Sequence, residues 1–289
     1  MADWRKIIRE NIDMKNLNTM KINAIVKFYS KPLNLDELLE VINFAQSKNL
    51  KILILGNGSN IIFSKKYYND LVIIDMKNFN KIEINNDILK VEAGVKSKDL
   101  INFSLKNRIS GFEFIAGIPG TIGGMIKMNA GAFGKNISNN LIKIKALDLK
   151  ELKLVELKKS ELKFSYRKTY GLENKIIISA KFKVNFAKKT EINDLIKEYL
   201  KIRKSKQPAG FSAGSIFKNP HNNFAGKLIE DCGLKGFSIN DASISEKHAN
   251  FIINRGNAKG EDIVKLIEVV KNRVKEKFNI KLEEEVEIV

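Results

Sequence analysis

The chain is poor in the residues that build disulfides and metal sites. Cys232 is the only cysteine among 289 residues, and only two histidines accompany it. One thiol cannot form an intramolecular disulfide, and so few Cys and His side chains cannot supply the ligands of a structural zinc site. We therefore expect no bound metal, and we expect Cys232 to be a small residue of the buried core.

Long apolar runs are also missing. No stretch approaches the ~20 apolar residues of a membrane span. The charged N-terminus, Met1 to Lys6, is not followed by the apolar core of a signal peptide. The sequence therefore predicts a cytoplasmic protein that does not enter a membrane, and its length allows one large domain or two to three smaller ones.

Acidic residues are few relative to basic ones, 33 against 51, which gives a formal net charge of +18. A basic surface can bind nucleic acid, but the lysines are scattered among Asp and Glu and do not alternate with aromatic residues as in RNA-binding proteins. We interpret most of the charge as a solvated surface that attracts small anions such as nucleotides. A nucleic-acid-binding protein is the alternative from a different class, and it predicts salt-sensitive binding and a colourless protein.

The hydrophobic periodicity predicts an α+β fold. A helix is expected to begin at Asn34, which forms a capping pair with Glu37, and a buried strand is expected over 51–55. The segment after that strand, Ile61 to Phe63, is expected to be extended. Further along we expect a hairpin over 81–93, helices over 97–106 and 190–204, antiparallel strands within 141–186 and, after a break at 207–210, a helix over 224–232, a strand over 250–254, a helix through 263–274 and a strand near 286.

Two glycine-bearing loops carry most of the information. The first is Gly56, Asn57, Gly58, Ser59 and Asn60, and the second is Gly117, Ile118, Pro119, Gly120, Thr121, Ile122, Gly123 and Gly124, followed by Asn129, Ala130 and Gly131. Glycine lets backbone N–H groups approach and wrap an anion such as a pyrophosphate. Neither loop fits the Rossmann fingerprint or the P-loop, since Ile61 replaces a required glycine and the second loop lacks the terminal Lys-Ser/Thr. We therefore expect a different dinucleotide-binding architecture, with a strand-to-strand Asn-Gly turn as the alternative for the first loop.

Three polar segments could carry chemistry. Ser215 follows a glycine, but Ala213 and Phe217 stand where the hydrolase motif G-x-S-x-G needs glycines. A loop serine bonded to its own backbone is the alternative there. Arg167 ends an alternating stretch and could be a sheet-edge charge in solvent. The acidic run at 283–285 could be an exposed turn, so no single segment decides the function.

In this order the motifs resemble the UDP-N-acetylenolpyruvoylglucosamine reductase family, FAD-dependent enzymes that complete UDP-N-acetylmuramate for bacterial peptidoglycan. The resemblance covers nearly the whole chain and rests on the segments 56–60, 111–114, 117–124, 129–134, 166–167, 214–220, 247–251 and 282–286. Several long motifs in the same order make a chance similarity improbable.

The resemblance implies a two-lobed FAD-binding domain of the vanillyl-alcohol-oxidase type over residues 1–207, with lobes of about 1–78 and 79–207. It implies a small α/β substrate-binding domain over 208–289. The short path from Arg167 to Ser215 resembles the shorter family class, which lacks an extra substrate-closing loop. We expect a monomer that binds a small-molecule substrate.

The resemblance also implies the site. Its catalytic positions match Arg167, Ser215 and Glu285, and its substrate contacts match Tyr166, Lys206 and Asn219. Both glycine loops would bind FAD, which NADPH would reduce. The flavin would then pass hydride to C3 of the enolpyruvyl group and Ser215 would give a proton to C2. Arg167 and Glu285 would stabilise the enolate-like charge.

The chain departs from the family pattern in the first FAD lobe. Asn23-Ala24 stands where the family usually has a glycine pair, and Ser64-Lys65-Lys66 replaces an Asp-x-Gly pattern. Both changes could loosen flavin binding without touching the reaction. An FAD oxidase of the same fold is the second hypothesis, and it predicts reduction by an organic substrate instead of NADPH.

Overall fold

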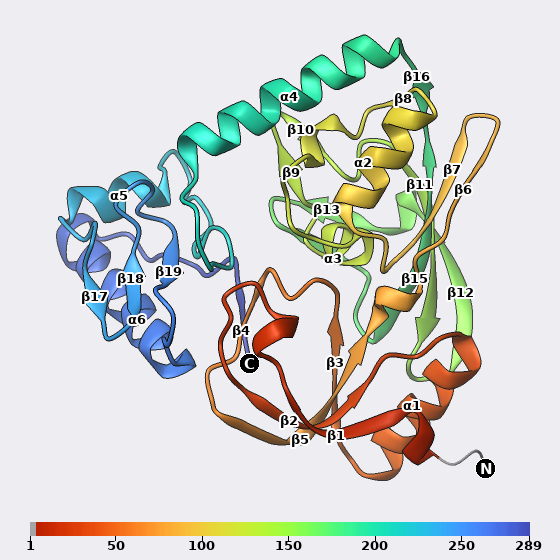
Figure 1. Cartoon of the computed structure of the whole chain (residues 1–289), viewed down its shortest axis with the longest axis horizontal. Coiled ribbons are helices and arrows are strands. Elements are labelled where there is room, and N and C mark those ends of the chain that lie inside the picture. The colour runs from red at the N-terminus through yellow and green to blue at the C-terminus, as the bar shows by residue number, and fades with distance from the viewer. Residues whose placement is uncertain (1–3) are drawn as a thin grey trace. The chain divides into compact units, whose positions relative to one another are not determined.

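The computed structural model describes residues 4–289, which form two compact units of mixed helix and strand (Figure 1). The first unit consists of residues 4–9, 28–57 and 71–203, and the second of residues 10–27, 58–70 and 204–289. Each unit is therefore assembled from separate stretches of sequence. The α+β class expected from the periodicity is confirmed.

The first unit contains a five-stranded sheet in the order β12-β11-β15-β7-β6, in which all neighbours are antiparallel. Its strands are β6 (Ile82–Asn85), β7 (Ile88–Glu92), β11 (Leu141–Asp148), β12 (Lys153–Lys158) and β15 (Lys175–Lys183). The pairing of β11 with β15 shifts register between Lys145 and Ala146. Ala146 packs in one buried cluster and Leu147 in a second one, so both faces of β11 are covered there and two consecutive residues are buried.

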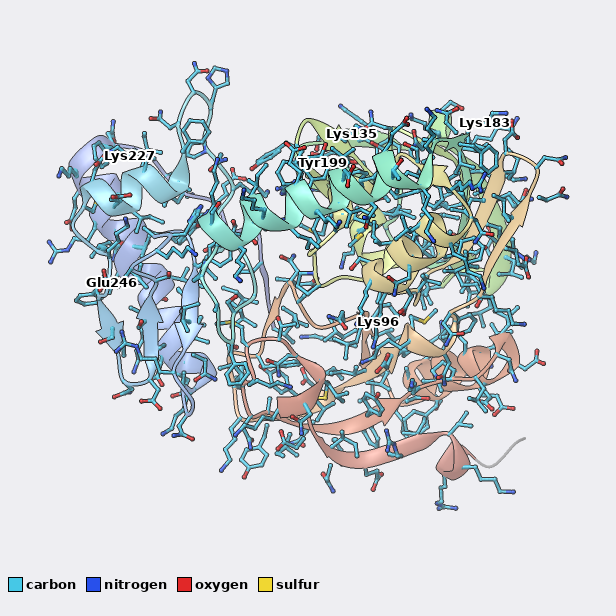
Figure 2. The ribbon with its side chains drawn as sticks, turned by 45° about the horizontal axis from the view of Figure 1, so that its top comes forward. Lys96, Lys135, Lys183, Tyr199, Lys227 and Glu246 are labelled. Atoms are coloured by element: carbon cyan, nitrogen blue, oxygen red, sulfur yellow. The ribbon has the colours of Figure 1, made fainter. Side chains whose placement is uncertain are left out.

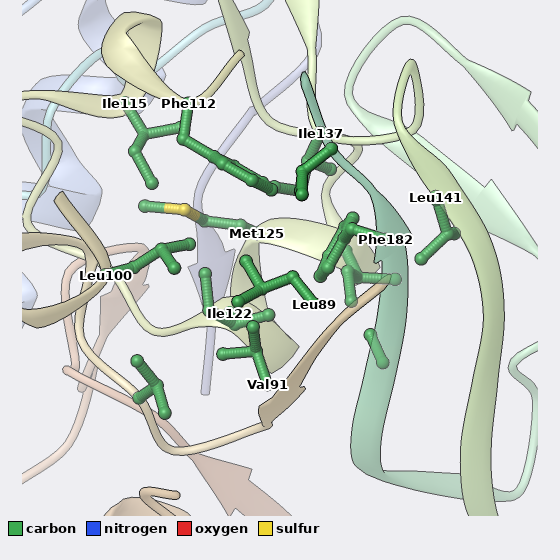
Figure 3. Packing of buried hydrophobic residues seen from close by; sticks show 14 of the residues in the cluster. Leu89, Val91, Leu100, Phe112, Ile115, Ile122, Met125, Ile137, Leu141 and Phe182 are labelled. Carbon is green, nitrogen blue, oxygen red and sulfur yellow. The ribbon is translucent and has the colours of Figure 1, made fainter. Parts of the chain in front are cut away.

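Helices α2 (Ser97–Lys106), α3 (Ile122–Lys127) and α4 (Lys189–Lys206) accompany this sheet. Figure 3 shows Leu89 and Val91 of β7 packed near Met125 of α3 and Phe182 of β15. Phe112 meets Phe182 edge to face, with ring centroids 5.3 Å apart. This core fixes α3, and so fixes the second glycine loop that leads into it.

A second core of the first unit lies against α1 (Leu35–Ser47). The sheet beside it has the order β1-β2-β5-β3, with β1 (Ile8–Asp13), β2 (Ile25–Ser30), β3 (Lys51–Leu55) and β5 (Tyr67–Asp75). The Asn34 side chain accepts a hydrogen bond from Glu37 N–H at 3.0 Å, as the capping pair predicts. Strands β3 and β5 are parallel, and β3 delivers the chain into the first glycine loop.

The second unit contains α5 (Ala225–Asp231) and α6 (Gly260–Phe278) with a sheet of β17 (Ser238–Ile239), β18 (Ala242–Ile244) and β19 (Ile252–Asn254). The apolar face of α6, including Ile263, Leu266 and Val270, is fully buried. A short parallel pair joins β4 (Ile61–Ile62) to β20 (Glu287–Ile288). The helix and strand predictions for this region are confirmed, although β19 begins two residues later than expected.

Short strand pairs and 3-10 turns complete the fold. The pairs are β8 (Ile109–Ser110) with β16 (Asn185–Phe186), β9 (Gly131–Ala132) with β10 (Lys135–Asn136), and β13 (Lys163–Ser165) with β14 (Lys168–Tyr170). The 3-10 turns are Trp4–Lys6, Lys15–Leu17, Met76–Asn78, Glu113–Ile115 and Lys159–Glu161.

The prediction for Cys232 is wrong in part. Its side chain is only half-buried, at the end of α5, although burial still raises the pKa of the thiol. The scattered lysines are exposed on different elements, as the labelled Lys96, Lys135, Lys183 and Lys227 illustrate (Figure 2). Among helices within residues 4–289, none has the length and apolar character that a bilayer crossing requires. The same residues contain no group of three His, Cys, Asp or Glu that could hold a metal ion.

Candidate active site

Arg167 lies in the two-residue turn of a hairpin in the first unit. Ser165 pairs with Lys168, so Tyr166 and Arg167 connect β13 to β14. Arg167 has a φ of 58°, a left-handed conformation that costs a non-glycine residue roughly 1–2 kcal/mol. Its side chain is half-buried and Nη1 donates to Gly131 O at 3.1 Å. Arg167 is therefore not a solvated sheet-edge charge.

The segment 129–131 lies against this hairpin. The Asn129 side chain is buried, and its Nδ2 donates to Ser165 O at 2.9 Å. A Cβ on Gly131 would collide with the side chain of Asn136 and the backbone of Lys135, so the residue must be glycine. Asn129, Gly131 and Arg167 thus form one contact group.

The two glycine loops meet at two points within the first unit. Asn57 Nδ2 donates to Pro119 O at 2.9 Å, and a Cβ on Gly56 would collide with Thr121 Oγ1. Ser97 supports the second loop from α2, since its N–H donates to Gly120 O at 3.0 Å and its hydroxyl donates to Ile118 O. No sequence motif indicates this role for Ser97, and Thr121 was predicted only as a member of the loop.

Gly123 and Gly124 begin α3 and serve different purposes. A Cβ on Gly123 would lie 2.9 Å from Ala93 Cβ, so close packing against the strand region requires glycine there. A Cβ on Gly124 would meet only Thr121 Oγ1, at 3.6 Å, which is an ordinary contact. Packing within the protein therefore explains Gly123 and leaves Gly124 unexplained.

Arg203 is a residue that the sequence analysis missed. It lies on α4, and its Nη2 donates to Phe114 O at 3.2 Å. Its guanidinium lies 5.3 Å from the ring centroid of Phe133, which stacks on Tyr199 with centroids 4.0 Å apart. A Cβ on Gly117 would come within 2.9 Å of Arg203 Cδ, so this glycine makes room for the arginine. The scarcity of arginine in the chain was the signal that could have found it.

Two guanidinium groups make this part of the first unit positive. Burial lowers the pKa of Arg203, and the positive charge of Arg167 lowers it further. Within residues 4–289, Arg203 Nε and Asn129 Oδ1 are buried without a hydrogen-bond partner from the protein. A buried donor and a buried acceptor left in this way indicate a polar ligand that satisfies them. These atoms and the glycine loops fit an anionic dinucleotide such as FAD.

Ser215 and Glu285 lie on neighbouring segments of the second unit. Ile216, directly after Ser215, accepts a hydrogen bond from Glu285 N–H at 2.7 Å. Lys218 N–H donates to Glu283 O at 2.9 Å, and Phe217 bridges Glu284. Both predicted residues are half-buried. The structure thus brings these two together by backbone pairing, and the serine is part of a bridged segment instead of a free loop.

Glu285 also lies beside the end of the first glycine loop. Asn60 Nδ2 donates to Glu285 O at 3.0 Å, and Glu287 N–H donates to Asn60 O at 2.9 Å. Ser64, one of the departures from the family pattern, donates to Val289 O through its N–H at 3.0 Å and its Oγ at 2.5 Å. The serine hydroxyl therefore adds a second hydrogen bond to Val289, the residue after β20.

The acidic run is not a simple exposed turn. Glu283 is exposed and pairs with Lys218 at 3.3 Å, whereas Glu284 is half-buried and pairs with Lys271 at 2.7 Å. Burial acts to raise the pKa of Glu284, but the hydrogen bond and charge of Lys271 outweigh it, so the pKa is lowered. A negative charge is therefore held one residue before Glu285.

The predicted substrate contacts are spread over both units. Tyr166 is 52% exposed, and the Arg167 guanidinium lies 5.0 Å from its ring centroid. Asn219 is exposed and its Oδ1 accepts from Ala225 N–H at 3.0 Å, at the start of α5. Lys206 is exposed at the end of α4, and no described contact links it to Ser215.

Comparisons with known proteins address the whole chain. Residues 26–157 match a family model described as an FAD binding domain, and residues 206–289 match the UDP-N-acetylenolpyruvoylglucosamine reductase C-terminal domain. The chain is 42% identical over 286 residues to the UDP-N-acetylenolpyruvoylglucosamine reductase of Aquifex aeolicus, covering 97% of this chain and 94% of that protein. It is 41% identical to the protein of the same name from Prochlorococcus marinus, covering 97% and 96%.

A solved structure shows the same similarity. The UDP-N-acetylenolpyruvylglucosamine reductase of Thermus caldophilus superposes with a TM-score of 0.84 at 30% identity. The match covers 97% of this chain and 99% of that one.

Proposed function

The chain belongs to the UDP-N-acetylenolpyruvoylglucosamine reductase family, and we propose that it uses NADPH to reduce the enolpyruvyl group of UDP-N-acetylglucosamine enolpyruvate, giving UDP-N-acetylmuramate. The observation that carries the proposal is the backbone pairing that places Ser215 next to Glu285, through the 2.7 Å bond between Glu285 N–H and Ile216 O. This backbone pairing brings together the segments that carry a hydroxyl and a carboxyl far apart in sequence.

Residues of both glycine loops and the segment 129–131 are proposed to bind FAD. Asn57, the second glycine loop and Asn129 to Gly131 would hold FAD, because glycine lets backbone N–H groups approach a pyrophosphate and Asn129 Oδ1 is buried without a protein partner within residues 4–289. FAD supplies the hydride, taken from NADPH, that is delivered to C3 of the enolpyruvyl group.

Arg167 would stabilise negative charge. Hydride addition at C3 leaves an enolate-like charge on C2 and its carboxylate, and a guanidinium held in a fixed position stabilises that charge without reorganising. The hairpin fixes Arg167 in a strained turn, and the bond to Gly131 O orients the side chain. Both features support a preorganised cation.

Ser215 would give its proton to C2, which completes the reduction. A serine hydroxyl is a weak acid, so it needs a neighbouring positive charge as the proton leaves. Lys218 lies three residues along the same segment and is half-buried, although it pairs with Glu283 at 3.3 Å. Glu285, in its protonated form, would hydrogen-bond the enol oxygen and keep that form in place.

The direct experiment follows the visible spectrum without oxygen. The purified protein with FAD should show flavin absorbance that bleaches on adding NADPH and returns on adding UDP-N-acetylglucosamine enolpyruvate. Bleaching without recovery would mean a flavoprotein with another acceptor. A protein that stays colourless after incubation with FAD would contradict the assignment of the glycine loops.

The proposal keeps three further expectations from the sequence. These are a monomer, a cytoplasmic location and no role for nucleic acid. Light scattering after size-exclusion chromatography tests the first, and cell fractionation tests the second. DNA or RNA binding that decreases steeply with salt would contradict the third.

A further inference from the structure

Asn250 holds the Ser215 segment from the side opposite Glu285. Its side chain is 4% exposed and makes two hydrogen bonds to a single residue. Phe217 N–H donates to Asn250 Oδ1 at 2.9 Å, and Asn250 Nδ2 donates to Phe217 O at 2.8 Å. The backbone of Asn250 accepts a third bond, from Ile216 N–H at 2.9 Å. Three hydrogen bonds thus join Asn250 to the two residues that follow Ser215.

The segment that contains Ser215 lies between two others, one containing Asn250 and one containing Glu285. On one side the backbone of Ile216 donates to Asn250, and on the other side it accepts from Glu285 N–H. Any movement of this segment along its neighbours would therefore move Ser215 relative to Glu285. The position of the segment depends on how firmly each side is bonded.

The backbone pairing with the Asn250 side is short. Ser215 and Phe251 form an isolated bridge and not part of a longer strand pair. A single bridge specifies register weakly, because few bonds resist slippage. The side-chain amide of Asn250 accepts from Phe217 N–H and donates to Phe217 O, so it replaces the backbone groups that a longer partner strand would offer. Phe217 is 1% exposed, so water cannot replace those bonds.

We propose that Asn250 is a positioning residue, which fixes Ser215 relative to Glu285 during proton transfer. The inference rests on the proposed function for the roles of Ser215 and Glu285. Asn250 acts through the backbone of Ile216 and Phe217, and not on the substrate itself.

The test compares two half-reactions in Asn250→Asp. The carboxylate keeps the acceptor for Phe217 N–H but sets a negative charge against Phe217 O. Because small displacements of reacting groups are costly, we expect reoxidation by the enolpyruvyl substrate to slow about 10- to 100-fold. The rate of flavin reduction by NADPH and the KM for NADPH should stay at their wild-type values, because neither NADPH binding nor flavin reduction uses Ser215.

Asn254→Asp is the matched control. Asn254 lies in the same unit, is 2% exposed, and also donates through Nδ2 to a backbone carbonyl, Met20 O at 2.8 Å. Its Oδ1 accepts from Gly256 and Ala258 N–H. The chemical change is therefore the same, but no described bond joins Asn254 to residues 215–218 or 283–285. This variant should lose stability and keep the wild-type ratio of the two half-reactions.

Amide hydrogen exchange gives a readout that needs no substrate. In Asn250→Asp the Ile216 and Phe217 amides should exchange at least about tenfold faster, because opening that segment becomes easier, while the α6 amides stay protected. Asn250→Ser, which is too short to reach both groups of Phe217, gives the same prediction if the aspartate variant does not fold.

The results distinguish a failure of the proposed function from a failure of the positioning role of Asn250. If the wild type is reduced by NADPH but not reoxidised by the enolpyruvyl compound, the proposed function fails, and the exchange comparison still decides whether Asn250 fixes the segment. Wild-type exchange at Ile216 and Phe217 in the Asn250 variants would overturn the inference. The inference would also be overturned if Asn250→Asp kept the wild-type ratio of the two half-reactions, as the control Asn254→Asp is expected to do.

Discussion

At Arg167 the backbone adopts a conformation that an arginine does not favour, and the β13–β14 pair enforces it. Strain of this kind persists where the surrounding structure fixes it, and it is common at functional sites. The sequence pattern could place Arg167 at the end of an alternating stretch. It could not give the bond to Gly131 O, because that bond depends on a segment 36 residues away.

The first prediction concerns Ser215. Ser215→Ala should leave flavin reduction by NADPH intact and slow reoxidation by the enolpyruvyl substrate about 100- to 10,000-fold, because it removes the proton donor. Stopped-flow absorbance measures both steps. Ser238→Ala, an exposed serine of β17 in the same unit, is the control and should behave as the wild type. Equal slowing of both half-reactions in Ser215→Ala would remove the serine from that role.

The second prediction separates two adjacent glycines. Gly124→Ala should fold at least as stably as the wild type, since a Cβ there makes only an ordinary contact with Thr121 Oγ1 and alanine favours a helix by up to about 1 kcal/mol. It should nevertheless bind FAD more weakly, because the Cβ occupies room that the ligand uses. Gly123→Ala is the comparison, and it should lose stability even without FAD because of Ala93.

Thermal unfolding without FAD and titration with FAD measure the two effects separately. Wild-type FAD affinity in Gly124→Ala would show that this glycine does not serve the flavin.

At the scale of elements, the helices and longer strands were predictable because their signals are local. Asn34 and Glu37 mark the start of α1, and Gly233 ends α5 with a φ of 70°. The short pairs were not predictable in the same way. Strand β20 pairs with β4, and Asn60 bonds a residue 225 positions later, which no periodicity can reveal.

The third prediction concerns the loop that precedes β19. Burial lowers the pKa of His248 below its ordinary value of 6.5, Lys235 lowers it further, and Glu230 opposes the shift. His248 Nδ1 accepts from Asn250 N–H at 3.2 Å, which requires the neutral ring. The unfolded chain therefore binds more protons below about pH 6.5. Stability should be constant above that pH and should fall as the pH drops below it.

Urea unfolding between pH 8 and 5.5 checks this dependence. His248→Gln should flatten the fall in that range, while His221→Gln, at an exposed position, should not. A wild-type protein that is equally stable at both ends of the range would contradict the assignment.

At the scale of the whole molecule, the sequence indicated the family and the flavin but not the division of the chain. The domain boundary expected at 207/208 stays a prediction. The second compact unit combines residues 10–27 and 58–70 with residues 204–289. Local breaks in the sequence, such as Pro208, can indicate a domain boundary. They cannot show that one unit is assembled from separate stretches of the chain.

The fourth prediction is a shift in stability with flavin. A ligand that binds only the folded state stabilises it by about 2.7 kcal/mol at a hundredfold excess over Kd. The melting temperature should therefore rise with FAD concentration, and NADPH alone should raise it less. A melting temperature that is independent of FAD would contradict flavin binding by this fold.

Because the second unit is assembled from separate stretches of the chain, its parts are made at different times on the ribosome. Ile61 and Ile62 are made long before β20, and at about 5–20 residues per second the intervening roughly 220 residues take about 11 to 44 s. During that interval Ile61 and Ile62 have no β20 to pair with. The nascent chain thus exposes an unpaired apolar strand, and a chaperone that binds such strands would find its substrate there.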